Sequence, residues 1–88
     1  PALDLAIIMA LMSSYKDRPV DPKMLIFGEV GLSGEVRAVS QASQRVNEAA
    51  KLGFTACVLP RVCADKMKPV EGIRLIGVSN VREAIGIM

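Results

Sequence analysis

The sequence predicts a small domain of the α/β (α+β) class. Segments with helical spacing of apolar residues are followed, after Gly- or Pro-containing turns, by short runs of β-branched and apolar residues. The chain has 88 residues, enough for one domain that buries roughly 60–65% of its unfolded surface. Apolar residues make up 51% of the chain and aromatic residues only 3%, so the core has to be built from aliphatic side chains.

The first segment, Leu3–Tyr15, is predicted to form a buried helix. Its apolar residues lie on nearly every side, which is typical of a helix enclosed by the rest of the core. Asp4 lies near the start, where a carboxylate suits the positive end of the helix dipole. The helix is expected to end within Ser13–Asp17. The apolar run Leu5–Met12 is far shorter than the roughly 20 residues of a membrane span, and it lacks the basic leader of a signal peptide.

A short buried strand is predicted at Met24–Phe27, and a hairpin with a tight turn near Ser33-Gly34 is predicted within Glu29–Val39. Three glycines punctuate this region, at positions 28, 31 and 34. A phosphate-binding loop would need a Gly-Lys-Ser/Thr ending, and the dinucleotide fingerprint needs its own glycine spacing. Backbone geometry is therefore the favoured reason for these glycines.

The next segment, Gln41–Leu52, has the apolar spacing of an amphipathic helix. Ser40 is the expected N-cap, and Gly53 is expected to end the helix in a left-handed conformation. Thr55–Leu59 follows as a strand that stops at Pro60. A helix between two strands of this kind is typical of a parallel crossover, which would be right-handed.

The C-terminal third is predicted to contain one more strand and one more helix. Arg61–Met67 is a short helical turn or a loop, and Ile73–Val78 is the last strand. Asn80 and Glu83 have the spacing of a capping box, which predicts a terminal helix that runs through Ile87.

Charge and cysteine content narrow the function classes. The net charge of +2 is too small to indicate a nucleic-acid partner, and the Lys and Arg residues are mostly interleaved with Asp and Glu, as on a solvated surface. Cys57 and Cys63 are the only cysteines and there is no His, so the chain cannot assemble a four-ligand zinc site by itself. We interpret them as a reduced pair in a cytoplasmic protein; a disulfide stays open, although their spacing does not argue for one.

The stretch Gly28–Pro60 resembles the protease domain of Lon-type peptidases. The matching residues are the ones that shape the backbone, namely Gly28-Glu29-Val30, Leu32, Gly34, Val36, Gly53 and Val58-Leu59-Pro60. The resemblance implies a Lon-like fold of the ribosomal protein S-five domain 2-like type, with a mixed sheet packed by helices. It implies that residues 1–88 are the C-terminal part of such a domain.

The two catalytic residues of Lon-type peptidases have no counterpart in this chain. The family's serine precedes the first helix, where this chain has Pro1-Ala2-Leu3-Asp4, and Ser13 and Ser14 lie at the other end of that helix. Ser43 stands where the family has its lysine, and a serine cannot replace an amine base. Arg45 is nearby, but its guanidinium stays protonated. The resemblance therefore implies a Lon-like frame without peptidase chemistry, and we predict that this chain is not an enzyme.

A closer resemblance, over essentially all 88 residues, is to the RadA (Sms) family of bacterial DNA-repair proteins. It is carried by Asp4-Leu5-Ala6, Ser13-Ser14, Arg18-Pro19, Phe27–Arg37 and Glu48–Phe54. In that family an upstream zinc finger and a RecA-like ATPase core precede the Lon-like domain, and neither is present here. The resemblance implies part of a ring-forming repair and recombination protein that uses ATP, magnesium and zinc. Such a protein binds single-stranded or branched DNA, acts with a recombinase filament and promotes branch migration.

Within such a protein, the chain is expected to act as a scaffold for oligomerisation and as a DNA-contacting surface. Arg37, Arg45 and Lys51 are the candidate DNA contacts, with ordinary solubilising charges as the alternative. Two other hypotheses stay open. One is a purely structural domain, which scattered charges would favour. The other is a degenerate peptidase that uses Ser40 or Ser43, for which the sequence supplies no His and no correctly placed Lys.

Pro1 occupies the place of an initiator Met, which indicates a piece of a longer protein. We expect that missing N-terminal strands leave a sheet edge or a core face uncovered. Because such surfaces favour pairing between chains, we predict a dimer or higher oligomer of this chain.

Overall fold

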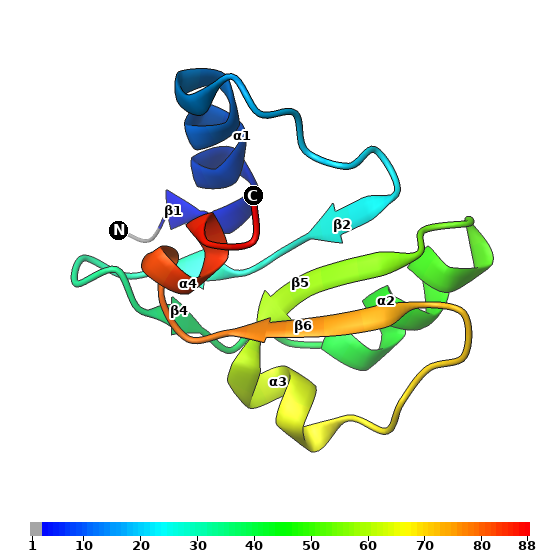
Figure 1. The fold of residues 1–88 in the computed structure, drawn as a ribbon. Helices are drawn as coiled ribbons and strands as arrows, with labels where there is room; N and C mark the ends of the chain where they lie inside the picture. Colours follow the sequence, from blue (N-terminus) through cyan, green and yellow to red (C-terminus); the bar gives the residue numbers. More distant parts are fainter. Residues whose placement is uncertain (1–2) are drawn as a thin grey trace.

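The computed structural model describes residues 3–88, which form six strands and four helices (Figure 1). In chain order they are β1 (Leu3–Asp4), α1 (Leu5–Lys16), β2 (Met24–Ile26), β3 (Glu29–Val30), β4 (Val36–Arg37), α2 (Ala42–Lys51), β5 (Ala56–Pro60), α3 (Arg61–Lys66), β6 (Arg74–Val78) and α4 (Val81–Ile85). The predicted α/β class is confirmed. The boundaries agree with the predicted segments to within a few residues for most elements.

The strands form two sheets, where the sequence predicts one mixed sheet. One sheet is antiparallel, in the order β1-β3-β4, and the other is parallel, in the order β2-β5-β6. The prediction of a single mixed sheet is therefore wrong. The chain leaves the parallel sheet at Phe27, whose N–H donates to Val58 O at 3.0 Å, and joins the antiparallel sheet two residues later at Glu29.

Gly28 makes this change of sheet possible. A Cβ at this position would lie 3.1 Å from Val36 Cγ1 and 3.3 Å from Leu5 Cδ2, and both of these neighbours are buried. The backbone φ of 157° is also one that side chains rarely adopt. Close approach and backbone conformation together explain the glycine, as the sequence predicts for this region.

The core has two halves, one on each face of the parallel sheet. The half on the α2 and α3 face includes Val46, Cys57, Leu59 and Cys63. The other half, on the α1 and α4 face, includes Leu5, Met9, Val58, Val78 and Ala84. Every residue of β5 is buried, because successive side chains of this central strand enter opposite halves.

Helix α1 starts two residues later than predicted and is buried on one face only. Leu3 and Asp4 form β1 instead of the first helical turn, and Asp4 is the N-cap. Leu5 and Met9 are fully buried. The opposite face carries four exposed apolar side chains: Leu3 (62% exposed), Ile7 (62%), Leu11 (66%) and Tyr15 (85%). The prediction of a helix enclosed on all sides is wrong, because no described element packs against this second face (Figure 1).

Helix α2 confirms the predicted amphipathic pattern but not its predicted cap. Ala42, Val46 and Ala49 are its buried residues. The N-cap is Gln41, in a left-handed conformation with φ 59°, and no side-chain cap bond forms, so Ser40 is not the cap. Gly53 has φ 96°, as expected for the residue that ends this helix. The strand that follows α2, β5, pairs in parallel with β2, but the antiparallel strands β3 and β4 lie between β2 and α2 in the chain, so the crossover is longer than a single helix.

The C-terminal elements follow the sequence pattern. Arg61–Lys66 is helical. Asn80 Oδ1 accepts from Glu83 N at 2.9 Å, and the Glu83 carboxylate accepts from Ser79 N, so the predicted capping box is confirmed in a form shifted by one residue. The predicted helix through Ile87 ends at Ile85. None of the helices formed by residues 3–88 combines the length and the apolar character that a membrane span requires.

We predict that Gly28→Ala lowers the free energy of unfolding by about 1–3 kcal/mol, as overpacked cores do. The added methyl group presses on the buried Leu5 and Val36 side chains. Thermal unfolding followed by circular dichroism measures the effect. Gly86→Ala is the matched control, since its φ of −64° suits alanine and its Cβ would make only ordinary contacts. Equal melting temperatures for the two variants would contradict this account of the sheet change.

Burial raises the pKa of the Cys57 thiol from 9.0 to about 12. The folded chain therefore holds Cys57 protonated, while the unfolded chain ionises near pH 9. Stability from this group is fully present below pH 9 and is lost as the pH rises toward 12. Because the thiolate is the reactive form, we expect peptide-level mass spectrometry at pH 8 to find Cys57 unlabelled by iodoacetamide until denaturant is added. Fast labelling of the folded chain would refute the assignment.

Candidate functional site

The start of α1 is the position at which the Lon resemblance places a serine, and the structure shows a helix cap there. Asp4 Oδ1 accepts from Ala6 N at 2.8 Å and from Ile7 N at 3.3 Å. These bonds satisfy two backbone donors that the first helical turn leaves without partners. Pro1 and Ala2 lie outside the described residues. At this end of α1 the described carboxylate therefore supports the helix.

A hollow of about 320 Å³ lies beside this cap, between the two sheets. Its lining residues are Leu3, Asp4, Phe27, Gly28, Glu29, Val39 and Arg45. The charged members are two carboxylates and one guanidinium. A guanidinium cannot act as a base and the carboxylates are not joined to a hydroxyl or thiol nucleophile in this hollow. The arrangement can bind a polar group, but the lining residues do not form a nucleophile–base pair.

Neither serine of the degenerate-peptidase hypothesis lines this hollow. Ser43 is exposed on α2 and lines a separate hollow of about 500 Å³ together with Lys66 and Lys68. Both lysines are exposed, whereas a lysine base depends on burial. Within residues 3–88 no hydrogen bond joins Ser43 Oγ to either amine. Ser40 is exposed in the loop before α2.

Among the three predicted DNA contacts, Arg45 is the one that lies over an aromatic ring and borders two hollows. Its guanidinium carbon lies 5.4 Å from the centre of the Phe27 ring, which is within range of a cation–π interaction. It borders the hollow beside Asp4 and also a smaller apolar hollow of about 240 Å³. The smaller hollow is lined by Leu25, Phe27, Arg45, Glu48, Ala49, Leu52 and Phe54. No carboxylate among the described residues comes within 4.0 Å of this guanidinium.

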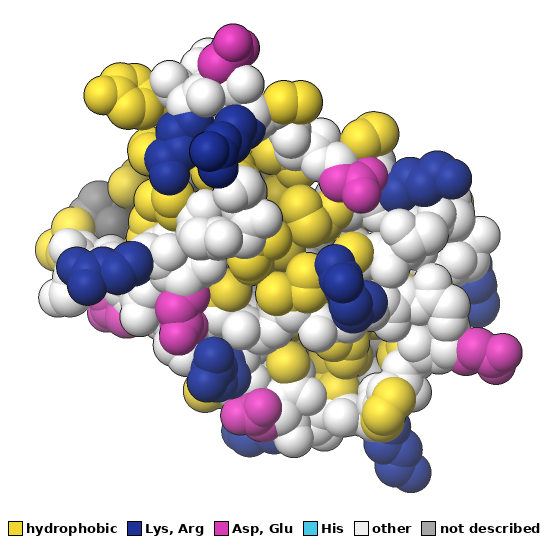
Figure 2. Space-filling model, viewed as in Figure 1, with side chains coloured by type: hydrophobic (Ala, Val, Ile, Leu, Met, Phe, Trp, Pro, Cys, Tyr) yellow, Lys and Arg dark blue, Asp and Glu magenta, His cyan; other side chains and the backbone are white. Residues whose placement is uncertain are grey.

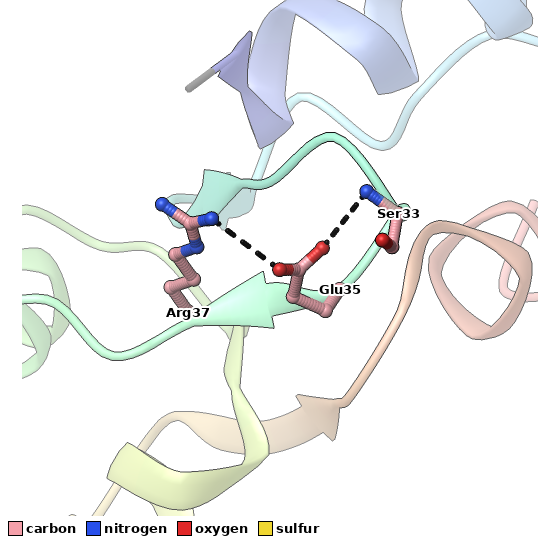
Figure 3. A network of polar contacts seen from close by, with 3 residues as sticks. All are labelled: Ser33, Glu35 and Arg37. Atoms are coloured by element: carbon pink, nitrogen blue, oxygen red, sulfur yellow. Dashed lines mark hydrogen bonds and ion pairs between the residues drawn. The ribbon is translucent and has the colours of Figure 1, made fainter. Parts of the chain in front are cut away.

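Arg37 belongs to a polar network in the β3–β4 hairpin (Figure 3). The Glu35 carboxylate accepts from Ser33 N at 3.1 Å and from Arg37 Nη2 at 3.4 Å. Backbone hydrogen bonding at Glu35 itself is the main reason that the pKa of this carboxyl lies below its usual value, and the side chain of Arg37 and the N–H of Ser33 lower it further. Desolvation acts in the opposite direction and is second in size. Arg37 also faces Glu29 across the hairpin. Its positive charge is therefore offset locally.

The three predicted DNA contacts do not form one patch. Lys51 lies in the last helical turn of α2, where a cation suits the negative end of the helix dipole. Arg45 and Lys51 are six residues apart, which places them about 120° from each other around the helix axis, and Arg37 is in the hairpin. On the face that Figure 2 shows, Lys and Arg side chains are interspersed with Asp and Glu. Such scattered charges are what the purely structural hypothesis expects.

The sequence reasoning missed the partner of Arg37 and the role of Asp4 as a cap. Glu35 and Arg37 are two residues apart, so a strand directs both side chains to the same face. An Asp directly before an apolar helical run is an N-cap signal. Both features could have been found from the sequence. The two cysteines are free, and the described residues contain no cluster of three or more metal-ligand side chains.

The fold and its hollows define a small mixed α/β domain whose described polar groups support structure and surface contacts. The sequence model of a family described as "Subunit ChlI of Mg-chelatase" matches residues 1–62. That match covers more than half of the chain, and the chain belongs to this family.

Curated relatives of the chain carry the name DNA repair protein RadA. The chain is 51% identical over 85 residues to RadA of Bacillus subtilis (strain 168), which covers 97% of this chain and 19% of that protein. The identity is 45% over 85 residues to RadA of Streptococcus pneumoniae, with 97% and 20% covered, and 47% over 87 residues to RadA of Synechocystis, with 99% and 17% covered. The chain thus spans about a fifth of the length of these relatives. The predicted resemblance to RadA is confirmed.

We predict that Gly31→Ala raises the pKa of Glu35 toward 4.5. A Cβ at Gly31 would lie 2.5 Å from Glu35 Cδ, so the carboxylate has to leave its bonds to Ser33 and Arg37. NMR titration of the Glu35 side-chain carboxyl measures the shift. Because a lowered pKa stabilises the fold above about pH 4.5 and this contribution is lost as the pH falls, the variant and the parent should converge in stability at low pH.

Ser33→Ala is the control for this prediction, since the bond to Glu35 comes from the backbone N–H of residue 33. This control should leave the pKa of Glu35 low. If the pKa of Glu35 stays low in the Gly31→Ala variant, the bonds of Glu35 to Ser33 and Arg37 do not set this pKa.

Proposed function

We propose that the chain is a Lon-like scaffold domain of a RadA-type DNA repair protein, with a secondary DNA-contacting surface and no peptidase chemistry of its own. The observation that carries this proposal is the identity of 44–51% to relatives named DNA repair protein RadA over 97% of the chain. Two structural features support the scaffold role. The start of α1 uses its polar group for capping, and α1 presents an exposed apolar face of the kind that protein contacts cover.

Arg45 leads the proposed DNA-contacting surface. A phosphate needs a cation that is not already neutralised, and among the described residues Arg45 has no carboxylate within 4.0 Å. The Phe27 ring lies beneath the guanidinium of Arg45. Lys51 contributes less, because the helix C-terminus already favours its charge. Arg37 contributes least, because Glu35 is bonded to it.

We assign the ATP-dependent activities that the RadA resemblance implies to a longer protein, since the chain spans about a fifth of the length of its relatives. We propose that this longer protein couples ATP hydrolysis, with magnesium, to branch migration on single-stranded or branched DNA. A zinc finger and a RecA-like core in the other parts of the protein would supply the zinc and nucleotide sites. A ring of such subunits acting with a recombinase filament in the cytoplasm is the setting in which a scaffold domain of this kind is useful.

Fluorescence anisotropy of labelled single-stranded DNA across a salt series tests the DNA-contacting surface. We expect weak binding that is lost as salt rises, because each phosphate contact contributes about 0.7 to the slope of log K against log salt on single strands. Arg45→Glu should weaken binding most, Lys51→Glu less and Arg37→Glu least. Arg82→Glu is the control, since it makes the same charge change on α4, on the other face of the parallel sheet.

Binding that falls equally in all four variants would indicate a general charge effect and would contradict the assigned surface. Absence of binding at low salt would assign DNA contact to other parts of the longer protein and leave this chain as a scaffold.

A further inference from the structure

The apolar hollow of about 240 Å³ lies at one edge of the parallel sheet, where β2 is an outer strand. One wall is a single face of α2 and its C-cap, with the i, i+3, i+4, i+7 spacing of a helix face: Arg45, Glu48, Ala49 and Leu52. The other wall comes from β2, the residue after it and the turn after α2: Leu25, Phe27 and Phe54. This space is called the β2-edge hollow below. It is smaller than the roughly 300–1,000 Å³ of a pocket for a drug-sized ligand, so it suits one small planar group.

Aromatic side chains are concentrated in the β2-edge hollow. Both phenylalanines of the chain line it, and the one other aromatic residue, Tyr15, is on α1. Phe27 is buried and lies under the Arg45 guanidinium, whereas Phe54 is only half-buried and offers the more accessible ring. Proteins that bind single strands stack bases on aromatic side chains of this kind, because every base has a π-face. The lining of the hollow therefore suits a nucleobase.

The charges at the rim of the β2-edge hollow fit a nucleotide. Arg45 has no carboxylate within 4.0 Å among residues 3–88, so its charge is free for a phosphate. In the other hollow that Arg45 borders, a phosphate would meet two carboxylates, those of Asp4 and Glu29. In the β2-edge hollow the one carboxylate is that of Glu48, whose Oε1 accepts from Gln44 Nε2 at 3.5 Å. A carboxylate in this position can accept from the amino group of a base such as cytosine.

We propose that the β2-edge hollow receives one unpaired base of a DNA single strand while Arg45 binds a phosphate of the same strand. This inference rests on the DNA-contacting surface of the proposed function, and it names the part of the nucleotide that enters the chain. An apolar side chain of a protein partner would fill the hollow but would leave Arg45 without an anion. A base inside a duplex is held in its stack and cannot enter without being extruded, so the site takes single strands.

Fluorescence anisotropy with two labelled strands of equal length tests the base contact without any change to the protein. One strand is an oligodeoxycytidylate, and the other has the same sugar–phosphate backbone but is abasic throughout. The parent chain should bind the abasic strand about fivefold more weakly or worse, because the stacking of a base on an aromatic ring is lost. The slope of log K against log salt should be the same for both strands, because the phosphate contacts are the same.

Substitutions in the chain separate the base contact from the phosphate contact. Phe54→Leu should weaken binding of the oligodeoxycytidylate about fivefold at every salt concentration and leave binding of the abasic strand unchanged. Leucine keeps an apolar side chain against the core half on which Phe54 packs, and circular dichroism checks that the variant folds. Arg45→Glu should instead lower the salt slope for both strands. Tyr15→Leu is the matched control, because it removes an exposed aromatic ring outside the hollow.

The outcomes separate this inference from the DNA-contacting surface itself. Equal affinity of the parent chain for both strands would overturn the base contact and keep Arg45 as a phosphate contact. A folded Phe54→Leu variant that binds the oligodeoxycytidylate like the parent, or a Tyr15→Leu variant that is impaired equally, would also overturn the assignment of the base to this hollow. Absence of binding to either strand at low salt would overturn the DNA-contacting surface, and the base contact with it.

Discussion

The structure depends on the burial of β5 on both of its faces. Val58 packs toward α1 and α4, and Cys57 and Leu59 pack toward α2 and α3, so this one strand joins the two halves of the core. Parallel pairing with β2 and β6 satisfies its backbone on both edges. The helices and most of the other strands each add side chains to one of these halves. The chain has only 88 residues and few aromatic side chains. It can form two core layers because the five buried residues of β5 contribute to both of them.

The burial of β5 on both faces also explains why one face of α1 is required for the core while its other face is exposed. Leu5 and Met9 pack in the same half of the core as Val58, so the face of α1 that carries them has to be apolar. No element within residues 3–88 packs against the outer face of α1, yet this face carries the apolar side chains Leu3, Ile7, Leu11 and Tyr15. Exposed apolar residues are ordinary when scattered, but a continuous row along one helix is the kind of surface that a protein contact covers.

Periodicity and local capping chemistry predicted the parts of the fold that depend on neighbours in sequence. The spacing of Ala42, Val46 and Ala49 was enough to predict α2, and Asn80 with Glu83 was enough to predict the start of α4. The exposure of α1 could not be predicted, because an all-round apolar pattern does not reveal whether a second layer of protein covers the helix. The split of the sheet depends on the close approach of the Gly28 backbone to the side chains of Val36 and of Leu5, and Leu5 is distant in sequence. For the site, the residue types were predicted, but not that Glu35 offsets Arg37 or that α2 separates Arg45 from Lys51.

The two proposed surfaces lie on opposite faces of the parallel sheet, and this has a consequence for how they can act together. Helix α1 packs on the face with Val58 and Val78, whereas Arg45 is on α2, on the face with Cys57 and Leu59. The start of α1 and Arg45 nevertheless border one hollow, because Leu3, Asp4 and Arg45 all line it. Because Ile7, Leu11 and Tyr15 do not line this hollow, substitutions at these three positions and substitutions around Arg45 should impair separate properties, and each set serves as a control for the other.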